Sequence, residues 1–466
     1  MPPLVALFLW FVLLLLLFHF DPAKDPEVSS ALWVPVIWIS IIASRLPSQW
    51  LGVKASLSEA LEEGNMLDRM VWIGLIVLAA VILNRRAFHW GDFIARNTVL
   101  MGYVLFALFS VLWSDFAFVA FKRWFRDLGS YLIVLIILSD PNPEKAVGTV
   151  LRRVSYLLIP LSIVLVKYFE MGRLYDPWSG VASVIGVATS KNMLGVLCLI
   201  SGLFFYWDTA ARWSDPKGRS KNIILVNLAF AAMTLWLLYR AHSITSTVCL
   251  CIGCIVIASA NGRLGQQHGN LLKVGIPACF CLYLILGFGF GLNGRFAAML
   301  GRDPTLTDRT KIWSLLLGMH TNPLIGTGYE SFWLGSRLDQ VFAKTGASIT
   351  EAHNGYLEIY LNLGFAGLLL LIGILIAAYR NISQRHSIGS AFTSLKFAFW
   401  TVAVFFNVTE AGFKHGLMWL AVLFGAISLR AVEDNQVLDA TTHPDALAEE
   451  QAVVVSSGEG EWSSAL

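Results

Sequence analysis

The sequence predicts an all-α fold: a polytopic membrane helix bundle with about 11–13 transmembrane helices and a large extracytoplasmic loop. Only 14% of the 466 residues are charged and 56% are hydrophobic, whereas soluble globular chains carry about 25% charged residues. The apolar residues fall into separated blocks, each about as long as a helix that crosses the hydrocarbon core. The alternating ten-residue pattern of a membrane β-barrel is absent from the sequence, so the expected spans are helices.

The helical elements are expected where these apolar blocks lie. Thirteen blocks are found, near residues 3–20, 31–44, 68–83, 98–114, 127–139, 154–168, 184–207, 221–238, 244–260, 271–292, 356–379, 396–409 and 416–431. The first lacks a basic leading region and a small-residue cleavage site, which favours a retained helix or anchor over a removed signal peptide. The short 31–44 and 127–139 blocks leave open which side of the membrane holds the N-terminus.

Basic residues in the short loops set the expected orientation, because such loops stay on the cytoplasmic side. They are Arg85, Arg86 and Arg96; Lys145, Arg152 and Arg153; Arg212, Lys217, Arg219 and Lys221; and Arg380, Arg385 and Lys396. Four regions follow: transmembrane helices in 1–292, a periplasmic loop with amphipathic helices in 293–355, further transmembrane helices in 356–432, and a cytoplasmic tail in 433–466. The acidic tail has few clustered apolar residues and is expected to be disordered.

Cysteine content and net charge exclude two classes of function. All six cysteines lie in apolar runs, and Cys249, Cys251 and Cys254 lack a second ligand pair at the spacing of zinc sites, so they are interpreted as packing residues. The net charge of +3 is small and dispersed. We therefore expect neither a metal site nor a nucleic-acid partner.

The outer loop contains the first candidate site, Arg309. Thr307 or Asp308 is a plausible N-cap, and apolar residues then recur at helical spacing, which predicts an amphipathic helix on the membrane surface. These apolar residues are Ile312, Leu315, Leu316 and Met319. Arg309 would lie in the first turn, where a helix N-terminus stabilises an anion. The alternative is an arginine that snorkels to phospholipid head groups.

Three further polar groups lie near the outer face. His353, at the mouth of the 356–379 helix, is a candidate general base or phosphate ligand, or else a hydrogen-bonded structural histidine. Lys191 either snorkels to the interface or pairs with a negative group. Arg240, in a very short outer turn, is placed to contact a diphosphate. The neighbouring Ser243 and Thr245 have the alternative role of joining helices.

A basic and aromatic patch is predicted on the same outer side. It comprises Lys122, Arg123, Trp124 and Arg126. Contact with a glycan or a diphosphate is one interpretation, and an interfacial anchor is the other.

Several short motifs, taken in order along the chain, resemble the O-antigen ligase and polymerase superfamily and most of all its exopolysaccharide-production polymerase branch. They are Glu63–Arg69, Leu112–Asp115, Ser190–Gly195, Leu300–Trp313, Pro323–Tyr329 and His353–Glu358. The resemblance implies a metal-independent glycosyltransferase without a cofactor, located in the bacterial inner membrane with its active site facing the periplasm. It also implies a donor glycan linked to a polyprenyl diphosphate. In this family two arginines hold the diphosphate and a loop histidine assists transfer, and Arg309 and His353 match those positions.

The chain departs from the family pattern at two positions. Ile244 stands between Ser243 and Thr245, where the family usually has a basic residue, and Asp308 replaces a common glycine. Arg240 lies one helical turn before Ile244 and is the candidate substitute.

The resulting hypothesis assigns a role to each candidate residue. Arg309, with Arg240 or Lys191, stabilises the departing diphosphate, while His353 orients or deprotonates the acceptor hydroxyl and Glu358 orients His353. The remaining predicted substrate-binding residues are Asn192, Asn354, Arg123 and Arg126.

Three functions remain open at this stage. The first is a polymerase that transfers glycan from the lipid-linked donor to a sugar hydroxyl in exopolysaccharide biosynthesis, and the second is a ligase that transfers it to lipid A core or protein. The third is a transporter or flippase of a lipid-linked glycan or another solute. The candidate residues gather at the outer face and not at the membrane midplane, which favours an enzyme. The expected partners are the donor, a glycan acceptor, membrane lipids and other polysaccharide export components.

Overall fold

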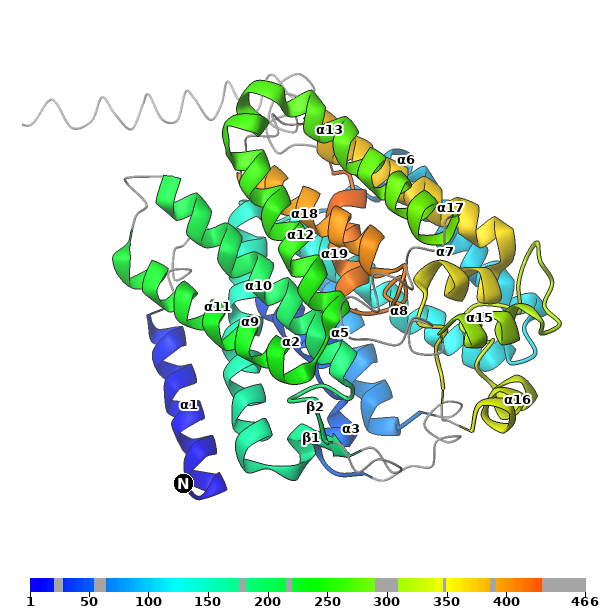
Figure 1. The fold of residues 1–466 in the computed structure, drawn as a ribbon, viewed down its shortest axis with the longest axis horizontal. Helices are drawn as coiled ribbons and strands as arrows, with labels where there is room; N and C mark the ends of the chain where they lie inside the picture. Colours follow the sequence, from blue (N-terminus) through cyan, green and yellow to red (C-terminus); the bar gives the residue numbers. More distant parts are fainter. Residues whose placement is uncertain are drawn as a thin grey trace, which may run out of the picture.

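The computed structural model confirms the all-α membrane fold (Figure 1). It describes residues 1–20, 28–53, 64–175, 182–214, 220–289, 309–346, 349–385 and 391–429. Asp308, Thr307 and the acidic tail lie outside these residues, so the predictions made for them are not addressed. The strands in the described part are β1 (Arg173–Tyr175) and β2 (Ala182–Val184), which pair antiparallel with Arg173 opposite Val184.

The helices follow the apolar blocks, in chain order. The first set is α1 (Pro3–His19), α2 (Trp33–Ile42), α3 (Pro47–Trp50), α5 (Met66–Arg85), α6 (Trp90–Arg96), α7 (Thr98–Phe109), α8 (Ala117–Leu138) and α9 (Pro143–Tyr168). The second set is α10 (Lys191–Ser214), α11 (Lys221–Ala241), α12 (Ile244–Asn261), α13 (Arg263–Leu284), α15 (Arg309–Leu317), α16 (Gly335–Thr345), α17 (Gly355–Arg385), α18 (Ala391–Phe406) and α19 (Leu417–Ala426). Short 3-10 turns at Ser30–Leu32, Ser110–Trp113 and Glu170–Gly172 and a π turn at Ile285–Gly289 complete them.

Fewer helices are long enough to cross a membrane than the sequence blocks suggested. Seven described helices are long and apolar enough, or up to eight if α6 and α7, bent by 95°, form one span. Shorter apolar helices at Pro3–His19, Ser30–Ile42, Phe392–Phe406 and Leu417–Ala426 account for other predicted spans. The predicted 127–139 block is only the second half of α8, whose first half carries Lys122, Arg123 and Arg126.

The bundle is built around α10, which packs against α9, α11 and α12. α12 also packs on α18, and α17 packs on α7 and α19. Small residues allow close approach: a Cβ on Gly253 would lie 2.5 Å from Leu203 Cδ2 and 3.0 Å from Val402 Cγ1. Such small-residue contacts are typical of helix packing in membranes.

The segment 323–329 is joined to α17 by backbone hydrogen bonds where that helix is broken at Gly364, whose φ is +63°. The amides of Phe365 and Ala366 donate to the carbonyls of Pro323 and Leu324 at 2.8 and 3.0 Å. These bonds replace the intrahelical bonds lost at the break, so the break anchors the outer segment to a transmembrane helix.

The described segments between α13 and α17, called the outer segments after their predicted side, have a small core to which α17 also contributes. Its buried members are Leu316, Phe332, Trp333, Leu338, Val341, Ala352 and Leu361. The predicted apolar face of α15 packs on protein through Leu316, which has no exposed area. This core holds α15 beside the loop that precedes α17 (Figure 1).

Candidate functional site

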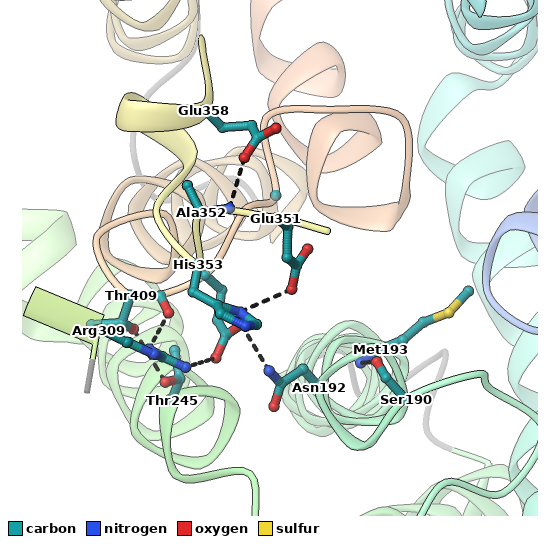
Figure 2. A network of polar contacts seen from close by, with 12 residues as sticks. Ser190, Asn192, Met193, Thr245, Arg309, Glu351, Ala352, His353, Glu358 and Thr409 are labelled. Carbon is teal, nitrogen blue, oxygen red and sulfur yellow. Dashed lines mark hydrogen bonds and ion pairs between the residues drawn. The ribbon is translucent and has the colours of Figure 1, made fainter. Parts of the chain in front are cut away.

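Arg309 and Glu410 form the centre of a polar cluster between the outer segments and the bundle (Figure 2). Arg309 is the first residue of α15, as predicted, and Glu410 lies in the turn after α18. Arg309 Nη2 lies 2.7 Å from Glu410 Oε1, and Nη1 donates to the carbonyl of Thr409. The side chains are 12% and 6% exposed, so this is a largely buried ion pair.

The Glu410 carboxylate also receives side chains from two other segments. Asn192 Nδ2, near the start of α10, donates to Glu410 Oε2 at 2.9 Å, and His353 Nδ1 lies 3.4 Å from the same oxygen. Figure 2 shows Arg309, His353 and Asn192 on three separate segments, with their side chains directed toward one another. Two of the predicted site residues, His353 and Asn192, are thus brought together with Arg309.

His353 is held in an unusual backbone conformation beside a second carboxylate. Its φ of +48° is rare for a residue other than glycine, and Nδ1 lies 2.9 Å from Glu351 Oε1. Burial lowers the pKa of His353, but its hydrogen bonds with Glu351 and Glu410 and their charges outweigh this and raise the pKa to about 9. The imidazole is therefore held in its protonated, cationic form at neutral pH.

Glu351 stays ionised. Burial raises the pKa of its carboxyl, but the hydrogen bond and charge of His353, with the charges of Lys414 and Arg309, lower the pKa overall. The cluster thus holds two cations, Arg309 and His353, against two carboxylates.

Glu358 does not contact His353 as the sequence suggested. Its Oε1 lies 2.6 Å from Lys414 Nζ and accepts from Trp333 Nε1, and its Oε2 accepts from the amide of Ala352 at 2.9 Å. The positive φ of His353 directs its ring away from α17 toward the bundle, so Glu351 and Glu410 are the partners of the imidazole. Glu358 instead positions the backbone immediately before His353.

Three other predicted residues have different surroundings. Asn354 Oδ1 caps α17 by accepting from the amides of Tyr356 and Leu357, both at 3.0 Å. Lys191 is exposed at the start of α10. The Arg240 guanidinium lies 5.9 Å from the Trp236 ring centre, and no contact between it and Arg309 is seen among the described residues.

Arg123 and Arg126 belong to a second group of polar residues. Arg126 Nε lies 2.8 Å from Asp127 Oδ1, and Arg126 Nη2 lies 3.1 Å from His415 Nδ1. Arg123 donates to the carbonyl of Glu330. These two arginines line a cavity of about 770 Å³ together with Lys414.

Glu351, His353 and Glu410 are also the residues that could hold a metal ion. One ligand atom from each lies within 4.8 Å of the others, and carboxylate with imidazole is a ligand set that divalent metals accept. A metal ion would have to displace the proton of His353 and compete with Arg309 for Glu410, because metal ligands must be deprotonated.

Glu410 and Glu351 were missed by the sequence reasoning. The available signal was the position of Glu410 at the edge of the apolar 396–409 block, because an ionisable residue beside a membrane span is a candidate functional group.

The fold and this cluster define a multi-pass helical membrane protein with a charged site outside its apolar spans. Residues 152–372 match the family model described as O-antigen ligase. The chain is 24% identical over 333 residues to "Exopolysaccharide production protein ExoQ" of Rhizobium meliloti (strain 1021), which covers 66% of this chain and 69% of that protein. The two matches confirm the resemblance to the O-antigen ligase and polymerase superfamily. The family match includes Arg309 and His353, whereas Glu410 lies beyond it.

Proposed function

We propose that this protein is a polysaccharide polymerase: a membrane glycosyltransferase that moves glycan from a polyprenyl-diphosphate-linked donor to a sugar hydroxyl in exopolysaccharide biosynthesis, on the periplasmic face of the inner membrane. One observation carries the proposal. Arg309 and the protonated His353 converge from separate segments on one carboxylate, Glu410. Two convergent cations in a partly buried site are what a diphosphate leaving group requires.

In the substrate-free site, Glu410 occupies the position of an anion. A donor diphosphate would take its place on Arg309 and His353, since both cations bind phosphate oxygens as readily as carboxylate oxygens. The anomeric C–O bond to the phosphate then breaks and the acceptor oxygen forms the new bond with inversion. The diphosphate leaves with its charge neutralised by the two cations.

A base must accept the proton of the acceptor hydroxyl. The Glu410 carboxylate, released from Arg309, is that base. Asn192 donates to Glu410 Oε2 at 2.9 Å and keeps the carboxylate at the site when Arg309 turns to the diphosphate. His353 acts in this scheme through its charge. The cations come from the protein itself, so the scheme operates without a metal ion.

A ligase is the second candidate, and the O-antigen ligase family match favours it. It shares the donor chemistry and differs in the acceptor, which would be lipid A core or protein. A transporter is less well supported, because the cations lie in loops and at helix starts and not in the middle of a span.

The test is glycan output in a deletion strain complemented with wild type, Arg309→Ala or His353→Ala at equal membrane abundance. Loss of either cation should reduce polymer at least about 100-fold, as for other charge-stabilising donors, with lipid-linked single units accumulating. Arg337→Gln is the control, because Arg337 pairs with Asp115 at 2.5 Å, away from the cluster. Full polymer from both site variants would refute the proposal, and glycan attached to lipid A core or protein would favour the ligase.

A further inference from the structure

A second charged cavity lies beside the Glu410 cluster and is separated from it by an ion pair. It is the cavity of about 770 Å³ lined by residues of α3, α5, α8 and the turn before α19. Lys414 lines it, and Lys414 Nζ lies 2.6 Å from Glu358 Oε1. Glu358 in turn binds the amide of Ala352, next to His353. The cavity and the proposed active site therefore share one wall.

The lining of this cavity is cationic and aromatic. Its cations are Arg69, Lys122, Arg123, Arg126 and Lys414, against the two carboxylates Asp68 and Glu330. Asp68 is already bound by the amide and hydroxyl of Ser48, at 2.9 and 2.5 Å. Arg126 and Lys414 are also paired with Asp127 and Glu358, which do not line the cavity, so the excess of positive groups is at the cavity surface.

His415 adds a neutral donor to the cationic lining. The charge of Arg126, followed by burial, lowers the pKa of His415 to about 3, so its imidazole is uncharged at neutral pH. Its Nδ1 faces Arg126 Nη2 at 3.1 Å and accepts from it. The proton of the neutral ring is then on Nε2, which is a hydrogen-bond donor.

An apolar wall adjoins the cations, with Lys122 Nζ 5.0 Å from the Phe118 ring centre, and it is open to the surroundings. It includes Trp72, Ile73, Phe118 and Phe121, and the last three are 51%, 72% and 44% exposed. A ligand that fits both walls has an anionic head and an apolar tail, and the cavity volume is in the range of small-ligand sites.

We propose that this cavity is a second lipid-binding site, which holds the phosphate or diphosphate head of the acceptor amphiphile on Arg123, Arg126 and Lys414 with its chain against the aromatic wall. The proposal rests on the proposed function, because a polymerase joins two lipid-linked units and needs a site for each. The shared Lys414–Glu358 wall places the acceptor next to the loop that carries His353.

The experiment measures how many equivalents of geranylgeranyl diphosphate bind to the full-length protein in detergent, by native mass spectrometry. Wild type should bind two. One equivalent should be lost in the double variant Arg123→Gln with Arg126→Gln, and one in the single variant Arg309→Gln. Arg337→Gln should still bind two equivalents. Two equivalents on the double variant, or one equivalent on wild type that Arg309→Gln abolishes, would overturn the second site.

A cavity-filling variant covers the case in which the double variant does not fold. Ile73→Trp should weaken geranylgeranyl diphosphate at one of the two equivalents at least about tenfold and leave inorganic diphosphate unchanged, since it fills only the apolar part. Equal weakening of both probes would overturn the assignment of the tail. Competition by phosphatidylglycerol at the same concentration as the prenyl diphosphate would show a general lipid site and overturn the acceptor role.

Failure of the two proposals can be told apart. Two equivalents on Arg309→Gln, with one lost on the double variant, would remove the diphosphate role of Arg309 and leave the cavity site standing.

Discussion

The Arg309 guanidinium and the Glu410 carboxylate meet at 2.7 Å although 101 residues separate them in the chain. The pair joins the outer segment to the turn after α18, and His353 and Asn192 approach the same carboxylate. A buried ion pair contributes little net stability, because the cost of desolvating both charges offsets their attraction. A functional role for the pair follows from the proposed function, in which a charged substrate exchanges with Glu410.

Glu410→Gln should strengthen anion binding and change its pH dependence. Geranylgeranyl diphosphate should bind wild type more weakly as the pH rises through about 9, because the raised pKa of His353, about 9, means that the imidazole loses its charge there. Removing the Glu410 charge lowers that pKa, so the midpoint should move down by about one unit. Near pH 7 the variant should bind more tightly than wild type, since the competing carboxylate is gone.

The measurement is a binding titration of both proteins from pH 6 to pH 10. An unchanged midpoint in Glu410→Gln would mean that Glu410 does not help set the pKa of His353. Weaker binding at pH 7 would contradict the exchange of Glu410 for the diphosphate.

The site was predictable where a motif carries the residue and not where the fold brings residues together. Arg309 and His353 were found from local sequence, because a helix start and a loop histidine leave a local signal. Glu410 was not found, since its role arises from contact with residues distant in the chain. Glu358, near the start of its helix, was expected to orient His353, but the ring lies against Glu351 and Glu410 instead.

The fold, like the site, was predictable where the sequence signal is local and not where distant segments meet. The apolar blocks predicted the helices, because each block must satisfy its backbone within the membrane. The outer segments could not be placed from hydropathy, since their core of Phe332, Trp333 and neighbours is assembled from short pieces. The amphipathic pattern of α15 therefore predicted its helix but not the protein residues on which Leu316 packs.

Lys414→Met should destabilise the protein by about 3–5 kcal/mol, because it leaves the Glu358 carboxylate, 1% exposed, without its cation. The double variant Lys414→Met with Glu358→Gln should recover part of this loss, as neither charge then remains. Thermal unfolding in detergent, at matched protein and lipid content, measures both. If the double variant is less stable than Lys414→Met alone, the ion pair is not the main way in which either residue stabilises the fold.

Gly326→Ala should lower stability far more than Gly346→Ala, although both glycines have nearly the same φ, +67° and +66°. Both substitutions carry backbone strain of about 1–3 kcal/mol. A Cβ at Gly326 would also lie 2.4 Å from the backbone carbon of Asn362, whereas a Cβ at Gly346 has open space. The additional loss at Gly326 should appear as detachment of the 323–329 segment from α17.

Hydrogen exchange of the Phe365 and Ala366 amides, which donate to this segment, measures that detachment. Equal exchange rates and equal melting temperatures in the two variants would contradict the proposed docking of the segment on the broken helix.

Asn354→Ala should reduce stability and leave donor affinity unchanged, because its side chain caps α17 and is not among the groups that reach Glu410. Loss of the two bonds to the amides of Tyr356 and Leu357 should cost about 1 kcal/mol, as for other N-caps. Asn354→Asp, which keeps the accepting oxygen but loses the Nδ2 donor to the Val408 carbonyl at 3.2 Å, should restore part of the stability. Melting temperature and prenyl diphosphate affinity, measured on the same preparations, separate the two roles. A large loss of affinity in Asn354→Ala with the melting temperature unchanged would return this residue to the substrate-binding set that the sequence predicted.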